Sequence, residues 1–131
     1  MIDDVEITDA GSVRKVVLCS GKVYYDLIEG RKASGDLSVA IVRIEQFYPF
    51  PLRSVRELLA KYASASQFVW AQEEPRNMGG WTFMRERLER LLDDPGKLSY
   101  VGREASASPA TGSYGVHQRE QEEIVSHALG A

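Results

Sequence analysis

The chain has 131 residues, of which 44% are hydrophobic and 27% charged, and its formal net charge is −3. This length and composition predict one globular domain and exclude a disordered or collagen-like chain, while the acidic balance argues against a nucleic acid or an anionic membrane as the partner. The single cysteine, Cys19, leaves no disulfide framework, and no apolar run reaches the roughly 18 residues needed to span a membrane.

Strand-like and helix-like patterns alternate along the chain. Residues 1–13 are predicted to form an N-terminal extension or an edge strand, because Val5 and Ile7 alternate with polar residues. A domain is predicted over residues 14–131. Its strands are predicted from short apolar runs at residues 15–19, 39–44, 67–72 and 98–102.

Apolar residues at helical spacing predict a helix after each of these strands. The first helix is expected to be capped by Ser20 and to end at Gly30 and residues 33–35. The other helices are predicted at residues 51–62, 81–92 and about 116–129. Strands joined by helices pair in parallel through right-handed crossovers. The sequence therefore predicts an α/β domain with three layers, α/β/α, around a mostly parallel sheet.

The stretch from residue 70 to residue 81, WAQEEPRNMGGW, carries the densest set of chemical groups. It follows an apolar strand pattern, and it is expected to turn at Gly79 and Gly80 into a helix that Trp81 opens. Ligands and partners of an open parallel sheet meet the carboxyl ends of its strands. Four segments are expected to gather there: residues 20–22, 45–48, 73–76 and 103–108.

Glu73 and Glu74 could be interpreted as a catalytic carboxylate pair. Adjacent residues of a strand point to opposite faces, so these two carboxylates are not expected to share a substrate. Ion pairing with Arg76, with Arg103 or with an arginine of a partner chain is the favoured interpretation.

The other candidate motifs carry little chemistry. Residues 20–22, Ser-Gly-Lys, match only a fragment of a phosphate-binding loop, which needs more glycine before the lysine. His117 and His127 lie ten residues apart on one predicted helix, about 15 Å along its axis, which is too far for one metal ion. The hydroxyls of residues 108–113 have no base at a nucleophile's usual spacing.

Four segments in this order closely resemble one family. They are residues 20–27 (SGKVYYDL), 41–51 (IVRIEQFYPFP), 70–81 (WAQEEPRNMGGW) and 100–113 (YVGREASASPATGS), followed by His117. Together they are similar to the C-terminal domain of the thiamine-diphosphate-dependent component of 2-oxoglutarate dehydrogenase. The resemblance covers about residues 14–129.

The resemblance implies a fold like the transketolase C-terminal domain, with a mostly parallel sheet of five strands. It also implies a role in a homodimeric enzyme of the tricarboxylic acid cycle. The parent enzyme decarboxylates 2-oxoglutarate and transfers a succinyl group to the lipoyl arm of a succinyltransferase component. Thiamine diphosphate and magnesium belong to the parent, which is expected in the bacterial cytoplasm or the mitochondrial matrix.

The chain lacks the family's cofactor signature, a Gly-Asp-Gly followed 25 to 30 residues later by asparagine. Its one Gly-Asp pair, Gly35 and Asp36, precedes Leu37, and its one asparagine is Asn77. No cofactor, metal ion or catalytic residue is therefore expected in this chain. We expect the isolated chain to be inactive.

The implied role is to contact the second subunit of the homodimer and the remaining domains of the parent chain. Effector binding is an additional implied role. The candidate residues for these contacts lie in the strand-end segments or in the turn that follows the third strand: Lys22, Glu73, Glu74, Arg76, Gly79, Gly80, Trp81 and Arg103. Two alternatives stay open at this stage. The domain could belong to a related enzyme for 2-oxoadipate, or it could be a stand-alone module that binds an anion or a nucleotide.

Overall fold

A computed structural model describes residues 1–107 and 114–130. Residues 108–113 and residue 131 lie outside the described residues. The hydroxyls of residues 108–113 that the sequence analysis considered are therefore not described. Four strands form the sheet: β1 (Lys15–Cys19), β2 (Val39–Arg43), β3 (Gln67–Pro75) and β4 (Leu98–Arg103). The helices are α1 (Val23–Ser34), α2 (Leu52–Lys61), α3 (Trp81–Leu91) and α4 (Tyr114–Leu129), with short 3-10 turns at Ala10–Ser12 and Pro95–Lys97.

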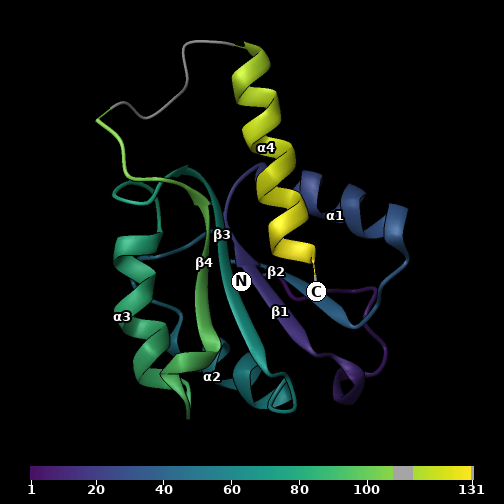
Figure 1. Cartoon of the computed structure of the whole chain (residues 1–131). Coiled ribbons are helices and arrows are strands. Elements are labelled where there is room, and N and C mark those ends of the chain that lie inside the picture. Colours follow the sequence, from purple (N-terminus) through teal and green to yellow (C-terminus); the bar gives the residue numbers. More distant parts are fainter. Residues whose placement is uncertain (108–113, 131) are drawn as a thin grey trace.

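The architecture has the expected three layers. The strand order is β2-β1-β3-β4, and every neighbouring pair is parallel. Helices α2 and α3 cover one face of the sheet, and α1 and α4 cover the other (Figure 1). All five residues of β1 are buried, since the central strands are covered on both faces. The α/β/α prediction is confirmed.

The prediction of five strands is wrong for the described residues, which form a sheet of four. At the β2 edge, the N-terminal segment makes a single antiparallel bridge between Ile2 and Arg43. The Ile2 amide donates to the Arg43 carbonyl at 2.8 Å, and the Arg43 amide donates back at 3.0 Å. Pairing stops there because the chain turns away after Ile2, and the next edge donor, the amide of Ile41, bonds instead to the Asp4 carboxylate at 2.7 Å.

Asp4 fixes this segment through a buried ion pair. Its carboxylate contacts the guanidinium of Arg31 on α1, and both side chains are at most 4% exposed. Arg31 also donates to the Val39 carbonyl at 3.0 Å. These bonds satisfy both charges, which a buried pair requires if it is not to destabilise the fold. Asp4 thus covers the edge of β2 where a further strand would pair.

Helix α1 ends at Ser34, within the stretch 33–35 that the sequence predicted, and it runs through Gly30, which was expected to contribute to its end. Gly30 faces α4, and a Cβ atom at this position would lie 2.8 Å from side-chain atoms of both Val125 and Leu129. The glycine therefore serves close packing of two helices. The helix ends at Gly35, whose φ of +70° is left-handed and whose amide donates to the Arg31 carbonyl at 2.7 Å.

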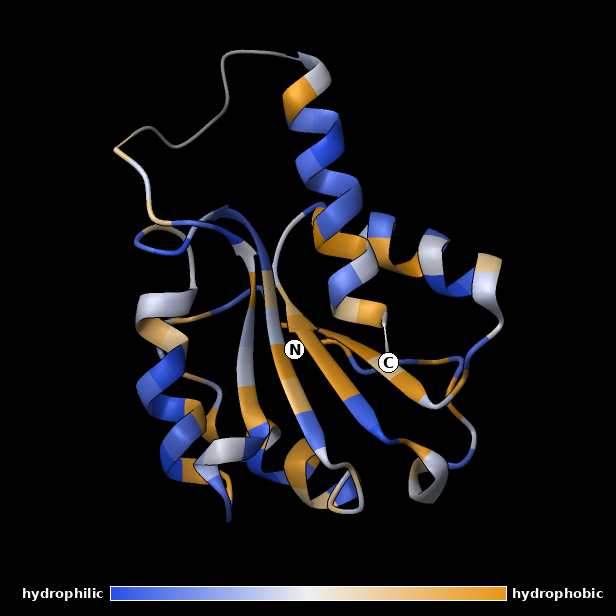
Figure 2. Ribbon diagram, viewed as in Figure 1, coloured by the Kyte–Doolittle hydropathy of each residue, from blue (hydrophilic) through white to orange (hydrophobic). Residues whose placement is uncertain are grey.

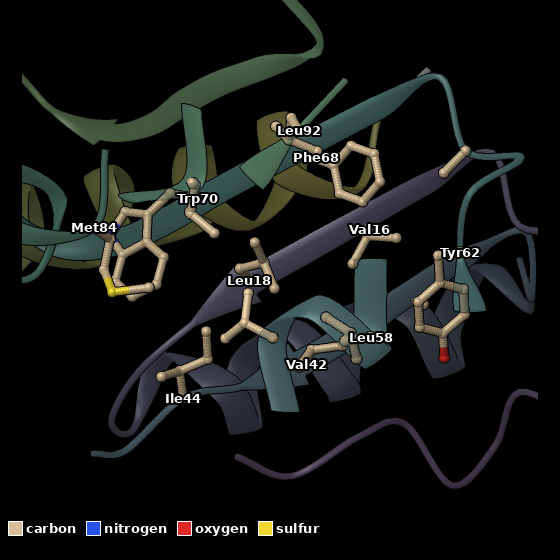
Figure 3. Packing of buried hydrophobic residues seen from close by; sticks show 14 of the residues in the cluster. Val16, Leu18, Val42, Ile44, Leu58, Tyr62, Phe68, Trp70, Met84 and Leu92 are labelled. Carbon is tan, nitrogen blue, oxygen red and sulfur yellow. The ribbon is translucent and has the colours of Figure 1, made fainter. Parts of the chain in front are cut away.

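The larger apolar cluster lies between the sheet and the α2–α3 layer. Alternate strand residues such as Val16 and Leu18 point into it, together with Leu58 from α2 and Met84 from α3 (Figure 3). The smaller cluster, between the sheet and the α1–α4 layer, takes the intervening residues of the same strands. Figure 2 shows the apolar colour concentrated on the strands, while most of the upper part of α4 is hydrophilic.

A buried lysine connects the first strand with the last helix. Lys15, at the start of β1, is 4% exposed, and its ammonium donates to the Ala128 carbonyl at 3.1 Å and to the Gly130 carbonyl. Burial holds the pKa of this amine below its usual value. A cation is favourable at this place because the carbonyl end of a helix carries partial negative charge.

Within residues 1–107 and 114–130, none of the helices combines the length and the apolar character that crossing a membrane requires.

Candidate functional site

Because all four strands are parallel, their carboxyl ends meet at one edge of the sheet, the upper end in Figure 1. The predicted candidate residues all lie at or just beyond this edge, on four segments that are distant in sequence. We call the surface formed here by Lys22, Glu73, Glu74, Arg76 and Arg103 the carboxyl edge. Three further candidates, Gly79, Gly80 and Trp81, lie beneath it.

The turn from β3 to α3 is organised by Gln72, a residue that the sequence did not mark as important. Its side chain is 2% exposed. Its carbonyl oxygen accepts from the Trp70 indole and from the Trp81 backbone amide, both at 2.9 Å. Its amide nitrogen donates to the carbonyls of Pro75 at 2.9 Å and Met78 at 2.8 Å. One buried side chain therefore fixes the strand, the turn and the first residue of the helix.

The two glycines of this turn allow close approach within the chain. Gly79 has a φ of +66°, and a Cβ atom there would lie 2.8 Å from the Glu74 carboxylate. A Cβ atom on Gly80 would lie 2.6 Å from the Trp70 ring and 2.8 Å from the Phe47 ring. All three distances are shorter than a Cβ atom tolerates, so larger residues would displace the turn.

Trp81 points into the core. It is 5% exposed and belongs to the larger apolar cluster, and its ring centroid lies 5.4 Å from that of Tyr100. A side chain this deeply buried offers a partner little area. The sequence placed Trp81 correctly at the start of the helix, but an amphipathic pattern alone does not say whether a tryptophan at a helix start faces the core or a partner.

Glu73 and Glu74 point to opposite sides of β3, as strand geometry predicts. Glu73 faces α1 and α4, where its carboxylate accepts from the Lys22 ammonium at 2.8 Å and from the Gln121 amide at 2.9 Å. Glu74 faces the turn at Gly79 on the other side. The hydrogen bond from Lys22 to Glu73 raises the pKa of the lysine. Two carboxylates on opposite faces cannot act as an acid and base pair on one substrate.

The partners of the two arginines differ from the expected glutamates of β3. The Arg76 guanidinium lies over the Tyr100 ring, 4.5 Å from its centroid. The Arg103 guanidinium lies 2.9 Å from the Glu120 carboxylate, and the arginine side chain is 13% exposed. Arg103 therefore joins β4 to α4, while Arg76, like Lys22, is an exposed cation of this edge.

The Ser-Gly-Lys segment does not form a phosphate-binding loop. The backbone amide of Gly21, whose φ is +79°, donates to the Glu45 carboxylate at 3.0 Å. An anion of the chain itself thus occupies the place in front of α1. The predicted cap is wrong, because Ser20 makes no cap bond and the helix begins after Lys22 without a side-chain cap.

The residues present do not fit the diphosphate and metal of the implied cofactor. Asp36 bonds to Ser38 and Arg14 at the end of the sheet where the strands begin. Asn77 bonds twice to the Ser106 backbone at the opposite end, at 2.9 and 3.0 Å. Among the described residues, no three His, Cys, Asp or Glu side chains gather in a way that could hold a metal ion.

The buried thiol is also unsuited to chemistry. Cys19 is completely buried in the smaller apolar cluster, and burial raises its pKa to about 12. A thiol with this pKa stays protonated at neutral pH, and the thiolate is the nucleophilic form. The described residues at the carboxyl edge thus offer paired charges and hydrogen-bonding groups on a turn that Gln72 holds by hydrogen bonds.

Comparison with known proteins gives a consistent result. A family model described as 2-oxoglutarate dehydrogenase C-terminal matches residues 1–129. The 2-oxoglutarate dehydrogenase E1 component of Haemophilus influenzae is 46% identical over 129 residues, which is 98% of this chain and 14% of that protein. That of Rickettsia conorii is 47% identical over 133 residues, 99% of this chain and 14% of that protein. The oxoglutarate dehydrogenase of Buchnera aphidicola is 41% identical over 129 residues. The chain spans 14% of the length of these relatives.

Proposed function

This chain belongs to the 2-oxoglutarate dehydrogenase C-terminal family, and from that premise we propose that it serves as a docking domain of a 2-oxoglutarate dehydrogenase E1 component. In this role the carboxyl edge contacts the other domains of the parent protein and the second subunit of a homodimer. The parent enzyme would decarboxylate 2-oxoglutarate and deliver the succinyl group to the lipoyl arm of its succinyltransferase partner.

The observation that carries the proposal is the rigidity of the turn beneath the carboxyl edge. Gln72 fixes this turn by four hydrogen bonds of 2.8 to 2.9 Å, so Glu74, Arg76 and Asn77 are presented on a preformed backbone. A preformed surface binds with less loss of conformational entropy than a mobile one. Arginine is also enriched at the energetic centres of interfaces.

Charge reversal at Arg76 tests the docking role in the parent protein. We expect Arg76→Glu to weaken subunit association by about tenfold or more, measured by analytical ultracentrifugation across a dilution series. Lys32→Glu is the matched control, because Lys32 is exposed on α1 near the opposite end of the sheet. The isolated 131-residue chain should keep its thermal midpoint in both variants.

Equal dimer dissociation of the Arg76 variant, the Lys32 variant and the unaltered protein would contradict the proposal. Trp81→Ala is a poorer test, because the burial of this ring makes loss of folding the first expected effect.

The proposed role is non-catalytic, and it places thiamine diphosphate and magnesium in the preceding domains of the parent. Neither Asp36 nor Asn77 is available to hold the cofactor in this chain, since each is bonded elsewhere and they lie at opposite ends of the sheet. We expect no carbon dioxide from 2-oxoglutarate when the isolated chain is supplied with both cofactors. Release above the background of a heat-denatured sample would overturn this assignment.

Effector binding is a second candidate role. The exposed Arg76 favours it, because a guanidinium stacked on an aromatic ring is well placed to receive a carboxylate or phosphate. Lys22 and Arg103 are already paired with Glu73 and Glu120, so an anion would compete with those carboxylates. Calorimetric titration of the parent protein with AMP and with acetyl-CoA tests this role.

The substrate of the parent protein is a separate question. Comparing its turnover of 2-oxoglutarate with its turnover of 2-oxoadipate identifies the substrate.

A further inference from the structure

A groove of about 480 Å³ lies between α2 and α3, at the end of the sheet where the strands begin. It is therefore separated from the carboxyl edge by the length of the sheet. We call it the α2–α3 groove. Its apolar lining consists of Leu59, Ala60, Ala63, Phe68, Leu91 and Leu92. Phe68 and Leu92 lie together at its base (Figure 3). The volume falls within the roughly 300–1,000 Å³ typical of small-molecule sites.

The rim of the α2–α3 groove is positively charged. It carries Arg56, Arg90 and Lys97 against one carboxylate, Asp93. This excess of cations contrasts with the net charge of −3 of the whole chain. Lys97 lies 3.5 Å from Asp93, so the one carboxylate of the lining is next to the lysine.

Arg56 and Arg90 provide the charge that remains. Arg90 pairs with Glu86 at 2.6 Å, but both side chains are at least 66% exposed, so water screens the pair. Arg56 forms no ion pair within residues 1–107 and 114–130. Two guanidinium groups thus flank an apolar trough, one from each helix.

The structure assigns the α2–α3 groove to a free medium-chain aliphatic carboxylate, such as octanoate. The apolar lining suits the alkyl chain, and the guanidinium groups of Arg56 and Arg90 suit the carboxylate, which arginine can bind through two parallel hydrogen bonds. A small hydrophilic anion would gain nothing from the leucine and alanine walls. A neutral alcohol of equal length would gain nothing from the arginines.

Titration of the 131-residue chain with sodium octanoate, followed by amide shifts in ¹H–¹⁵N NMR spectra, tests the assignment. We expect a Kd of about 1 mM and shifts centred on Ala60, Ala63, Leu91 and Lys97. Hexanoate should bind about fifteenfold more weakly because it buries two fewer methylenes. Octan-1-ol should bind at least fivefold more weakly than octanoate.

Three variants separate the charge from the apolar lining. Arg56→Gln should weaken octanoate about fivefold and leave octan-1-ol unchanged. Arg53→Gln is the matched control, since Arg53 is an exposed arginine on the same helix outside the groove, and it should change neither. Ala60→Phe should fill the trough and abolish both, while the exposed position of Ala60 keeps the fold intact.

Each of three outcomes would overturn the assignment. They are equal affinity for octanoate and octan-1-ol, equal loss of octanoate binding in Arg56→Gln and Arg53→Gln, and shifts centred at the carboxyl edge. Because the groove lies at the other end of the sheet, the docking role of Arg76 is tested separately, by subunit association in the parent protein, and none of these outcomes decides it.

Discussion

The α2–α3 layer and the α1–α4 layer cover opposite faces of one sheet with different chemistry. On the α2–α3 side, large side chains such as Trp70, Tyr62 and Met84 fill a deep apolar cluster. On the α1–α4 side, the buried residues of the cluster are aliphatic or small, and α4 contributes only Ile124 and Ala128 as fully covered residues.

The α1–α4 side compensates for its small cluster with close backbone approach and polar contacts. Gly30 lets α1 and α4 meet closely. Gln121 donates to Asp26 and Glu73, and Glu120 pairs with Arg103, so polar contacts hold the part of α4 that rises beyond the sheet. We infer that separating α4 from the sheet costs less free energy than separating α3. A polar contact contributes less net stabilisation than the burial of a large apolar side chain.

The largest expected effect comes from truncation in the α2–α3 layer. Leu88→Ala removes a fully buried side chain of α3 and should lower the free energy of unfolding by about 2–5 kcal/mol, as a cavity in a packed core does. Ile124→Ala on α4 should cost less, at the lower end of the same range, about 2–3 kcal/mol. Urea denaturation measures both. A larger loss of unfolding free energy in the Ile124 variant would contradict the view that the α1–α4 layer is the weaker one.

An intermediate effect is expected where the two helices of the weaker layer touch. Gly30→Val should cost about 1–3 kcal/mol, because its side chain would collide with Val125 and Leu129. Hydrogen exchange should then accelerate in α4 and stay unchanged in α3. Ala33→Val is the matched control, because it places the same side chain on the exposed face of α1. Uniform acceleration in all four helices would show that α4 does not separate by itself.

The smallest effect concerns a polar contact on the stronger layer. Burial disfavours the ionised form of Asp3, but hydrogen bonds from Lys61, from the Asp4 amide and from Tyr62 outweigh it and hold the pKa of Asp3 below its usual value. A lowered pKa stabilises the fold at pH values above the unfolded-state pKa, about 3.9, and this stability is lost as the pH falls through the folded-state pKa.

Asp3→Asn should therefore cost a few tenths of a kcal/mol at pH 7, since Asp3 is 35% exposed. Urea midpoints between pH 7 and pH 2 should show that the deficit begins to shrink below about pH 4 and disappears once the pH falls below the folded-state pKa of Asp3. A deficit that stays constant over this range would mean that packing, and not charge, is the cause.

Local patterns predicted most of the elements. The strand at residues 15–19 matches β1, and the apolar stripes of α2 and α3 place these helices within one residue of their observed ends. Periodicity succeeds here because burial on one stripe or on both strand faces leaves a direct trace in the sequence.

Three departures depend on tertiary contacts that no local pattern contains. Gly30, predicted with residues 33–35 to end α1, instead packs inside the helix against residues almost a hundred positions later. The third strand was predicted to end at residue 72, yet an irregular register lets β3 continue to Pro75, which pairs with Arg103. Gln72 resembled an ordinary polar strand residue until its hydrogen bonds showed it to be buried. Trp70 lies two residues earlier on the same strand face, and the need of a buried indole N–H for an acceptor is a signal that could have drawn attention to Gln72.

The bond from Lys15 to the Ala128 carbonyl joins residues 113 positions apart, and this separation has a consequence for biosynthesis. Helix α4 follows all four described strands in the sequence, so the ribosome synthesises it after them. Until then, the face formed by Val17, Ile41 and Val69 has only α1 to cover it. Closing a loop of this size is slow compared with forming a helix. The nascent chain therefore passes through an interval in which a chaperone can bind an apolar sheet face that the finished domain conceals.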